Sequence, residues 1–385
     1  MMEFNLIATA TFGLEAIVKR EVEELGYPIT ETFNGGVLFK GGGEAIKKCN
    51  LYLRSADRVL ICVNKFKAYS FEELFDNTYS IPWEDFIPNK ATFPVVGKSI
   101  KSLLHSVPNC QKMVKKAIAT RLGEYYKTNW IEETGPLYKI EVTLLKDEVI
   151  LTIDTTGPGL HKRGYRNLTG YAPLKETLAA ALVDLSYYSQ DRFLYDPFCG
   201  TGTILIEAAM KVLNIPPGLN RSFVCETWEN LGTGDFAKIR EEGRDSILNE
   251  ELNIFGSDVD GSQLSLARAH IENAGLEGKI HVQKLDVKEF KSSKKYGIII
   301  ANPPYGERMG SAESVQPLYK YMGGFYEEHP TWSCYFLTAY KDFEKVFGQK
   351  ASRRRKLYNG KIECTYYQYL GPKPPMRKDV DNEGK

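Results

Sequence analysis

The sequence predicts an α/β protein, with an open and mostly parallel sheet in its second half and smaller α+β units before it. From residue 173 onward, short apolar runs alternate with segments whose apolar residues recur at helical spacing, as in repeated strand–helix units. Near its end the chain has Asn359-Gly360 between two strand-like runs, the strongest short signal for a β-hairpin. Before residue 160 the alternation has shorter units, which favours two-layer α+β folds.

Composition and charge exclude several classes of protein. The chain has 385 residues, of which 43% are hydrophobic and 26% charged, so it is neither disordered nor fibrous. No apolar run approaches the roughly 20 residues of a membrane helix, and charges interrupt the N-terminal region where a signal peptide needs an apolar core. The seven cysteines are scattered without CxxC spacing, which argues against a disulfide framework or a zinc site. We expect a cytoplasmic protein with reduced thiols, no metal and no membrane partner.

The first half of the chain divides into two small domains, expected at 1–64 and 65–157. In the first, a strand precedes a helix that Gly26 can stop, and a glycine turn leads into the next strand. In the second, two runs with period-two alternation predict adjacent strands. In order, the expected elements are strand 4–9, helix 14–25, strand 35–39, helix 44–53, and strands 58–63, 137–144 and 148–154.

The second of these domains carries a basic stretch. Between residues 89 and 131 there are eight Lys or Arg residues and one acid, Glu124, although the whole chain has a net charge of only +1. A solvated helix face would also be rich in lysine. Positive charge over such a length without acids favours contact with a phosphate backbone, because each contact releases condensed counterions. The candidate contacts are Lys98, Lys101, Lys112, Lys115, Lys116 and Arg121, with Arg163 and Arg166 in the linker that follows.

The second half contains the predicted parallel sheet. A linker rich in glycine and basic residues, expected at 158–172, precedes a domain at 173–378, and a charged tail follows at 379–385. A polar excursion at 214–250 interrupts the strand–helix pattern. The expected helices are 174–185, 204–213 and 262–274, and the expected strands are 193–197, 254–257, 281–284, 297–301 and 334–338, before the hairpin at 356–370.

The sequence Asp-Pro-Phe-Cys-Gly-Thr-Gly-Thr at 196–203 lies between a strand and a helix. Its two glycines let the backbone approach a ligand closely, and the helix beyond offers unpaired N–H groups. A dinucleotide site would need a third glycine where this chain has Leu205. The carboxylate of Asp196 would also repel a pyrophosphate. It suits a ligand with a cationic end, such as the amino-acid moiety of S-adenosylmethionine.

Acids also follow the next two predicted strands. Asp258, within Gly-Ser-Asp-Val-Asp, is placed to accept hydrogen bonds from the two hydroxyls of a ribose. Asp286, followed by Val287, could accept one from an adenine amine. Each acid alone would more commonly cap a helix. Three consecutive strands that each end in an acid indicate a ligand site, because the carboxyl ends of parallel strands meet at one edge of the sheet.

The sequence Asn-Pro-Pro-Tyr-Gly follows the fourth apolar strand, at 302–306. The two prolines stiffen the loop and remove backbone donors, which leaves the Asn302 side-chain oxygen and the Pro303 carbonyl as free acceptors. Two acceptors can hold both hydrogens of an amine and direct its lone pair outward. Tyr305 adds a flat face on which a base can stack.

These four motifs, in this order, resemble the motif series of S-adenosylmethionine-dependent amino-group methyltransferases that act on nucleic-acid bases. The strings RGYRNLTGYAPLKETLAAAL and DPFCGTGTILIEAA, with the basic segment before them, resemble the THUMP-domain RNA methyltransferases. Among these, the sequence is most similar to the bacterial RlmL-like (YpsC-like) guanine-N2 methyltransferases of large-subunit ribosomal RNA. The likeness spans nearly the whole chain, although some members carry a second methyltransferase domain that this sequence is too short to contain.

The resemblance implies a Rossmann-like class I methyltransferase domain with a seven-stranded, mostly parallel sheet and a C-terminal hairpin. Ferredoxin-like and THUMP domains would precede it, and RNA would be the partner. S-Adenosylmethionine would lie against Asp196, Pro197, Phe198, Cys199, Gly200, Gly202, Thr203, Asp258, Asp286, Val287 and Asn302. The target base would lie against Asn302, Pro303, Pro304 and Tyr305.

The implied reaction is direct displacement at the sulfonium methyl by the N2 amine of a guanosine in RNA, with 23S ribosomal RNA as the expected substrate. A base within a duplex could not reach such a pocket, so the target must be unpaired or flipped out. Three alternatives remain open at this point. They are a transfer-RNA guanine-N2 methyltransferase, a DNA adenine-N6 methyltransferase, which could use the same loop, and a non-catalytic RNA-binding assembly factor.

Overall fold

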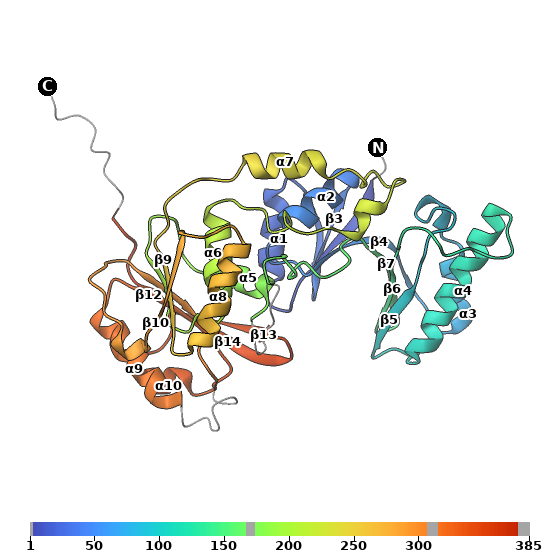
Figure 1. Ribbon diagram of the computed structural model, residues 1–385. Helices are drawn as coiled ribbons and strands as arrows, with labels where there is room; N and C mark the ends of the chain where they lie inside the picture. The colour runs from blue at the N-terminus through green and yellow to red at the C-terminus, as the bar shows by residue number, and fades with distance from the viewer. Residues whose placement is uncertain (1–2, 167–173, 306–314, 376–385) are drawn as a thin grey trace. The chain divides into compact units, whose positions relative to one another are not determined.

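The computed structural model describes residues 3–166, 174–305 and 315–375. They form two compact units, which are described separately: residues 1–164 with 214–247, and residues 165–213 with 248–385 (Figure 1). The final part of the expected linker and the expected tail at 379–385 lie outside the described residues.

The first unit contains one continuous sheet of seven strands. The strands are β1 (Phe4–Thr9), β2 (Ile29–Phe33), β3 (Gly36–Gly41), β4 (Arg58–Lys67), β5 (Val95–Ile100), β6 (Ile140–Leu145) and β7 (Glu148–Asp154). Their order across the sheet is β2-β3-β1-β4-β7-β6-β5. All pairs are antiparallel except β5 with β6.

Strand β4 belongs to both of the expected small domains. Its first part pairs with β1, where Arg58 lies opposite Thr9, and its later part pairs with β7 as far as Lys67 opposite Glu148. The register shifts between Cys62 and Asn64, at the point where β4 leaves β1. The boundary that we expected after residue 64 therefore falls inside a strand, and the two domains share one sheet.

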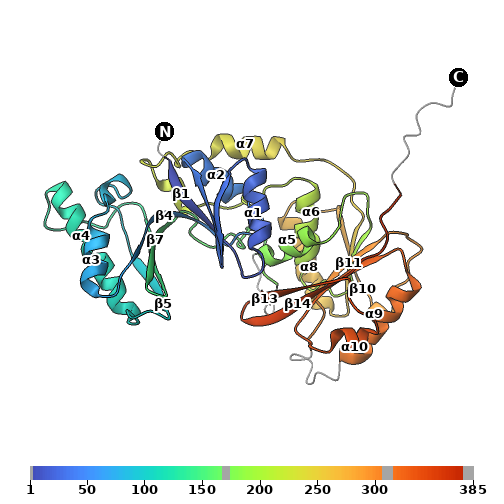
Figure 2. The same cartoon turned by 180° about the vertical axis from the view of Figure 1, so that it is seen from behind.

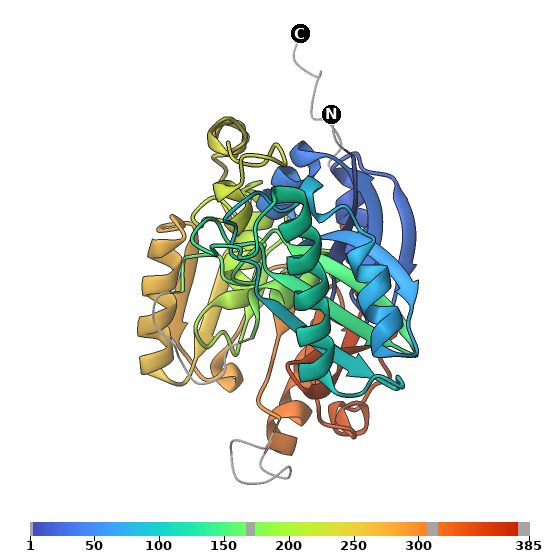
Figure 3. The same ribbon diagram turned by 90° about the vertical axis from the view of Figure 1, so that its right-hand side faces the viewer.

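Helices cover this sheet in two groups. Helices α1 (Glu15–Glu24) and α2 (Gly43–Tyr52) pack on the strands around β3, and α3 (Phe71–Tyr79) and α4 (Val107–Tyr126) pack beside each other near β5 and β6 (Figure 3). A short 3-10 helix, η1 (Trp83–Asp85), follows α3. Helix α4 has Pro108 in its first turn, where a backbone N–H would have no hydrogen-bond partner within the helix. The helix is followed by Lys127, whose backbone is in the left-handed region.

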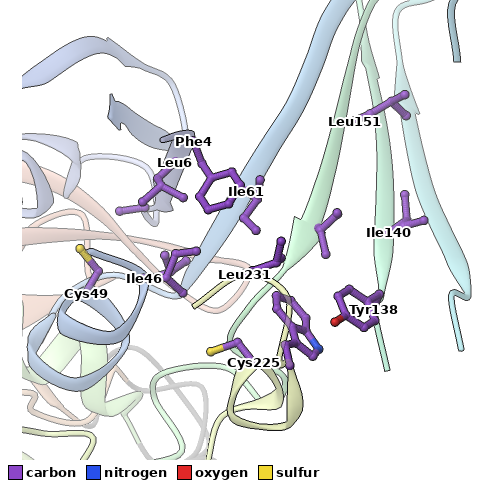
Figure 4. Close-up of a cluster of buried hydrophobic side chains, with 14 of the residues drawn as sticks. Phe4, Leu6, Ile46, Cys49, Ile61, Tyr138, Ile140, Leu151, Cys225 and Leu231 are labelled. Carbon is purple, nitrogen blue, oxygen red and sulfur yellow. The ribbon is translucent and has the colours of Figure 1, made fainter. Parts of the chain in front are cut away.

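The polar excursion packs into the core of the first unit. It contains η2 (Val224–Thr227) and α7 (Ala237–Asp245). The ring of Trp228 stacks on Tyr138 with centroids 4.4 Å apart and planes 10° apart, and its Nε1 donates to the carbonyl of Leu137 at 2.9 Å. Cys225 and Leu231 join the apolar cluster of the sheet and α2 (Figure 4). The stretch expected to be part of one continuous domain at 173–378 therefore belongs structurally to the first unit.

The second unit contains the predicted parallel sheet. Its strands are β8 (Leu194–Asp196), β9 (Ile254–Asp258), β10 (Ile280–Lys284), β11 (Ile298–Ala301), β12 (Ser333–Thr338), β13 (Arg353–Asn359) and β14 (Ile362–Tyr369). The order is β10-β9-β8-β11-β12-β14-β13, with the first five strands parallel and the last two antiparallel. The expected hairpin is present, with Gly360, whose φ is 64°, and Lys361 in its turn. Asn359, which we expected in the turn, is the last residue of β13 and pairs with Ile362.

Helices lie on both faces of the second sheet. They are α5 (Glu176–Leu185), α6 (Thr203–Val212), α8 (Gly261–Asn273), α9 (Gln316–Glu328) and α10 (Phe343–Phe347), with the 3-10 helix η3 (Val287–Glu289). Helices α6 and α8 lie on one face, and α9 and α10 pack together on the other (Figures 1 and 2). This order of strands, which reverses between β8 and β11, confirms the predicted Rossmann-like sheet with its C-terminal hairpin. None of the described helices is long and apolar enough to cross a membrane.

Candidate active site

The motif residues lie at the ends of four neighbouring strands. Asp196 is the last residue of β8, Asp258 the last of β9, Asn302 directly follows β11, and Asp286 lies two residues beyond β10. These strands are parallel and adjacent in the order β10-β9-β8-β11. Their carboxyl ends therefore share one edge, and the order reverses between β8 and β11, where ligands bind in open α/β sheets.

The loop after β8 has the backbone that its glycines were expected to provide. Gly200 and Gly202 have φ values of 51° and 82°, in the region that favours glycine. A Cβ added at Gly200 would meet no atom within 4 Å, so the loop leaves open space there. At Gly256 of β9, an added Cβ would lie 2.4 Å from Leu205 Cδ1. Close packing of β9 against α6 therefore requires a glycine at position 256, because the Leu205 side chain occupies the space where a Cβ would lie.

Asp196 is a buried carboxylic acid with an altered pKa. Its side chain accepts a hydrogen bond from Phe198 N at 3.0 Å, and the residue is 1% exposed. The pKa of Asp196 is raised to about 8, mainly by burial and to a smaller extent by the nearby charge of Asp258. A cationic ligand would stabilise the ionised form of this buried carboxyl group and so lower its pKa.

The other two acids are partly engaged by backbone. Asp258 accepts from Gly200 N at 3.0 Å with Oδ2 and from Asp260 N at 2.9 Å with Oδ1. Each carboxylate oxygen has a second lone pair, so hydroxyl donors can still be bound. Asp260 rather than Asp258 caps α8, whereas Asp286 caps η3 by accepting from Lys288 N at 3.0 Å. Asp286 thus caps a helix, as an isolated acid commonly does. Asp258 instead binds the loop at residues 197–202, which we call the glycine loop.

The loop at residues 302–305, which we call the proline corner, is held by a hydrogen bond from Tyr319. The Tyr319 hydroxyl donates to the Pro304 carbonyl at 2.6 Å and lies 3.2 Å from Thr338 Oγ1 on β12. Pro303 is buried, whereas Asn302 is half-buried. These contacts fix the loop against the sheet edge, as its two prolines predict.

Tyr305 lies differently from our expectation. Its hydroxyl donates to Asn302 Oδ1, and the thiol of Cys364 on β14 lies 3.8 Å from the same hydroxyl. Burial raises the pKa of the Tyr305 phenol. The Asn302 oxygen that we expected to be free is thus the acceptor of a hydrogen bond from the Tyr305 hydroxyl.

The candidate RNA contacts fall into two groups. Acids outside the basic stretch neutralise several of them, because Lys98 pairs with Glu141 and Lys115 with Glu133, at 3.0 and 2.5 Å. Arg121 pairs with Glu84, and Arg163 is buried and donates to backbone carbonyls. Arg166 pairs with Glu176 at 3.1 Å. Of the eight candidates, Lys101, Lys112 and Lys116 are exposed and have no ion pair to another described residue.

One residue of the site was missed by sequence reasoning. His270 on α8 is fully buried, and its Nδ1 lies 3.2 Å from the carbonyl of Thr201 in the glycine loop. A single histidine in a helix carries no pattern that indicates such a contact. The one clue in the sequence is that His270 lies about three helical turns after Asp258. This clue identifies a contact with the glycine loop only when the fold is known.

The open sheet, the glycine loop after β8 and the proline corner after β11 together define a methyltransferase of the Rossmann-like class. Comparison with family models agrees. Residues 163–368 match the RMKL-like methyltransferase domain, residues 5–60 the RlmL ferredoxin-like domain and residues 68–154 the THUMP domain. The chain belongs to this RMKL-like methyltransferase family.

Two relatives show how much of the chain is shared with other members of the family. The putative RNA methyltransferase YpsC of Bacillus subtilis is 49% identical over 385 residues, covering 99% of this chain and 100% of YpsC. The ribosomal RNA large subunit methyltransferase K/L of Shewanella baltica is 30% identical and matches 98% of this chain. The match covers only 54% of the K/L protein, so this chain spans about half of its length.

Solved structures show the same fold over nearly the whole chain. A protein of Listeria monocytogenes, described as a predicted N6-adenine-specific DNA methylase, is 51% identical with a TM-score of 0.92, covering 97% of each chain. The putative methyltransferase SMU.472, solved as a complex with SAH, is 43% identical with a TM-score of 0.91 and covers 97% of this chain and 100% of its own. Both confirm the fold that the motif order predicts.

Proposed function

We propose that this protein transfers the methyl group of S-adenosylmethionine to the N2 amine of a guanosine in large-subunit ribosomal RNA. The observation that carries the proposal is the adjacency of β8 and β11, since it brings the glycine loop and the Asn-Pro-Pro-Tyr corner to one edge of the sheet. A cofactor on the first and an amine on the second would then be neighbours, and positioning of two reactants is a large part of catalysis.

The residues present fit S-adenosylmethionine. Asp196 offers a buried carboxylate to the cationic amino-acid end, and the open side of Gly200 leaves room for the chain that joins it to the nucleoside. Asp258 retains lone pairs for ribose hydroxyls. When bound, the cofactor supplies an electrophilic methyl group on a sulfonium. The SAH complex of the 43% identical SMU.472 protein supports this assignment.

The proline corner would hold the amine. A guanine N2 amine is conjugated with its ring, so hydrogen bonds to Asn302 Oδ1 and the Pro303 carbonyl would oppose that conjugation and stabilise the charge that develops on nitrogen. The Tyr305 hydroxyl must first leave Asn302 Oδ1, because the amine needs that acceptor. Its ring then becomes available for stacking on the base. No strong general base is required, since the nitrogen loses its proton readily once it is cationic.

RNA is the favoured substrate class. The THUMP domain match and the unpaired Lys101, Lys112 and Lys116 support contact with a phosphate backbone, and the relatives YpsC and K/L are named as RNA and ribosomal RNA methyltransferases. We accordingly propose a cytoplasmic site of action. The second candidate is adenine-N6 methylation of DNA, which the description of the 51% identical Listeria protein favours and for which the same corner would serve. A transfer-RNA guanine is the third.

The deciding experiment measures where the methyl group goes. Purified protein and labelled S-adenosylmethionine are incubated with total RNA and with genomic DNA from cells that lack the protein. We expect label in large-subunit ribosomal RNA, recovered as N2-methylguanosine by mass spectrometry of nucleosides. Label in DNA as N6-methyladenine, or in transfer RNA, would replace the proposal by one of its rivals.

A further inference from the structure

Two buried side chains hold the glycine loop through hydrogen bonds. His270 Nδ1 lies 3.2 Å from the carbonyl of Thr201, and Arg166 Nη2 donates to the hydroxyl of Thr203. Thr201 and Thr203 flank Gly202, whose positive φ starts α6. Both holding groups are removed from water, because His270 is fully buried and the Arg166 side chain is 13% exposed.

Arg166 is placed for structure rather than for RNA. Its guanidinium pairs with Glu176 at the start of α5 at 3.1 Å and donates to the Leu174 carbonyl at 3.3 Å. Glu176 is itself 3% exposed. A buried ion pair is costly to desolvate, and good geometry together with further hydrogen bonds offsets that cost. Here the third contact of the guanidinium, the one to Thr203, is the one that reaches the cofactor loop.

His270 is held in a defined orientation. Because its partner is a carbonyl, Nδ1 must carry the proton. The Tyr165 ring lies beside the imidazole with centroids 6.4 Å apart. The Tyr165 hydroxyl donates to Glu207 on α6 at 3.1 Å, and the Tyr165 backbone carbonyl accepts from the Asn273 side chain on α8 at 3.1 Å. Tyr165 thus contacts both α6 and α8.

We propose that Arg166 and His270 are positioning residues that fix Thr203 and Thr201, and so keep the glycine loop in the conformation that binds the cofactor. This inference rests on the proposed function, in which that loop receives the amino-acid end of S-adenosylmethionine. It changes the expected role of Arg166, which the sequence suggested as an RNA contact.

A double-mutant cycle tests the Arg166 half. Arg166→Lys keeps the charge beside Glu176 but cannot also reach Thr203, and Thr203→Val removes the acceptor. We expect each variant to weaken SAH binding, measured by calorimetry, by about five- to tenfold, since a buried hydrogen bond contributes about 1 kcal/mol. The double variant should be no weaker than the weaker single one, because both remove the same bond. Strictly additive losses would overturn the proposal.

Two isosteric variants test the His270 half. The amide nitrogen of Asn can take the position of Nδ1, whereas that of Gln reaches toward Nε2. We expect His270→Asn to keep SAH affinity within about threefold of wild type and His270→Gln to lose about tenfold, measured at a temperature at which both variants are fully folded. If Asn and Gln lose equally, the bond to Thr201 does not position the loop. Should Arg166→Lys fail to fold, this pair decides the question.

The controls separate this inference from the proposed function. If wild-type protein does not bind SAH, the proposed function fails and the inference with it. If wild type binds but the variants bind equally well, the inference alone fails. RNA affinity, measured by filter binding, should be unchanged in all variants. A loss of RNA affinity in Arg166→Lys with intact SAH affinity would return Arg166 to the role of an RNA contact.

Discussion

The carboxylate of Asp258, at the end of β9, accepts a hydrogen bond from the backbone N–H of Gly200 at 3.0 Å. This bond joins the second strand end to the loop that follows the first. It also brings a negative charge close to Asp196, whose pKa is raised mainly by burial and further by Asp258. The same carboxylate therefore holds the loop and contributes to the raised pKa of its neighbour.

The first prediction concerns pH. With a pKa of about 8, Asp196 is mostly protonated below pH 8 in the protein without cofactor. A cationic ligand end favours the ionised form, so binding below pH 8 must release a proton. We expect SAH affinity to rise with pH between 6 and 8, by up to about tenfold per pH unit, and to level off above 8. Calorimetry at fixed ionic strength measures this.

Asp196→Asn is the matched control for the pH profile. Its amide oxygen can still accept from Phe198 N, yet it cannot ionise. The variant should bind SAH weakly, with no rise between pH 6 and 8. A flat profile in the wild-type protein would show that Asp196 does not ionise on binding.

The second prediction concerns Asn302. Replacing it with Ala removes one of the two acceptors for the amine and leaves the glycine loop untouched. The kcat of methyl transfer should fall by about a hundredfold or more, as for the loss of one group that stabilises a transition state. SAH affinity should stay within about twofold of wild type. Comparable methylation rates for Asn302→Ala and wild type would reject this role.

Much of the fold could be predicted from sequence, for a physical reason that β11 and β2 illustrate. All four residues of β11 (Ile298–Ala301) are buried, so their apolar run marks the strand in the sequence. Strand β2 (Ile29–Phe33) lies at the edge of its sheet with three exposed residues, so it has no apolar pattern and was missed. The segment that forms helix α4 was singled out in the sequence for its basic residues, and no helix was predicted there.

The partners of individual side chains were not predictable. Trp228 stacks on Tyr138, and nothing local to either residue indicates that contact. The charge of Arg166 suggested a phosphate, whereas the fold supplies Glu176 as its partner. Strand ends can be placed by period and order, and the candidate site was found in this way. Pairings between distant segments depend on the completed fold.

The third prediction follows from the contact between Tyr305 and Asn302. In Tyr305→Phe the ring remains for stacking, but no hydroxyl occupies Asn302 Oδ1. We expect kcat/KM for RNA to rise by about two- to tenfold, since a hydrogen bond of about 0.5–1.5 kcal/mol no longer has to be broken. Tyr305→Ala should instead lower kcat/KM by about fivefold or more, because stacking on a base contributes about 1–3 kcal/mol. If Phe and Ala are equally impaired, the hydroxyl has a positive role in the reaction.

The fourth prediction concerns the segment 214–247. Trp228 is fully buried, so Trp228→Ala should lower the free energy of unfolding of the first unit by about 3–5 kcal/mol. Trp130, which is 79% exposed, is the matched control, and its replacement by Ala should change stability by less than about 0.5 kcal/mol. Urea denaturation followed by circular dichroism gives both values. Equal midpoints for the two variants would mean that the Trp228 stack contributes little to the unit.

The fifth prediction separates RNA contacts from structural lysines on α4. Lys112 and Lys116 lie one turn apart and are exposed, whereas Lys115 is paired with Glu133 and lies 3.4 Å from the Phe93 ring centroid. Lys112→Gln and Lys116→Gln should each weaken RNA binding and reduce the slope of log affinity against log salt by about one.

Lys115→Gln should leave that salt slope unchanged, because its charge is already neutralised by Glu133. Its effect should appear as a lower urea midpoint. Filter binding between 50 and 200 mM salt distinguishes the three variants, since each lost phosphate contact removes one released counterion. If Lys115→Gln reduces the slope as much as Lys112→Gln, the pair with Glu133 opens when RNA binds, and ion pairs in the free protein do not identify which lysines contact the phosphates.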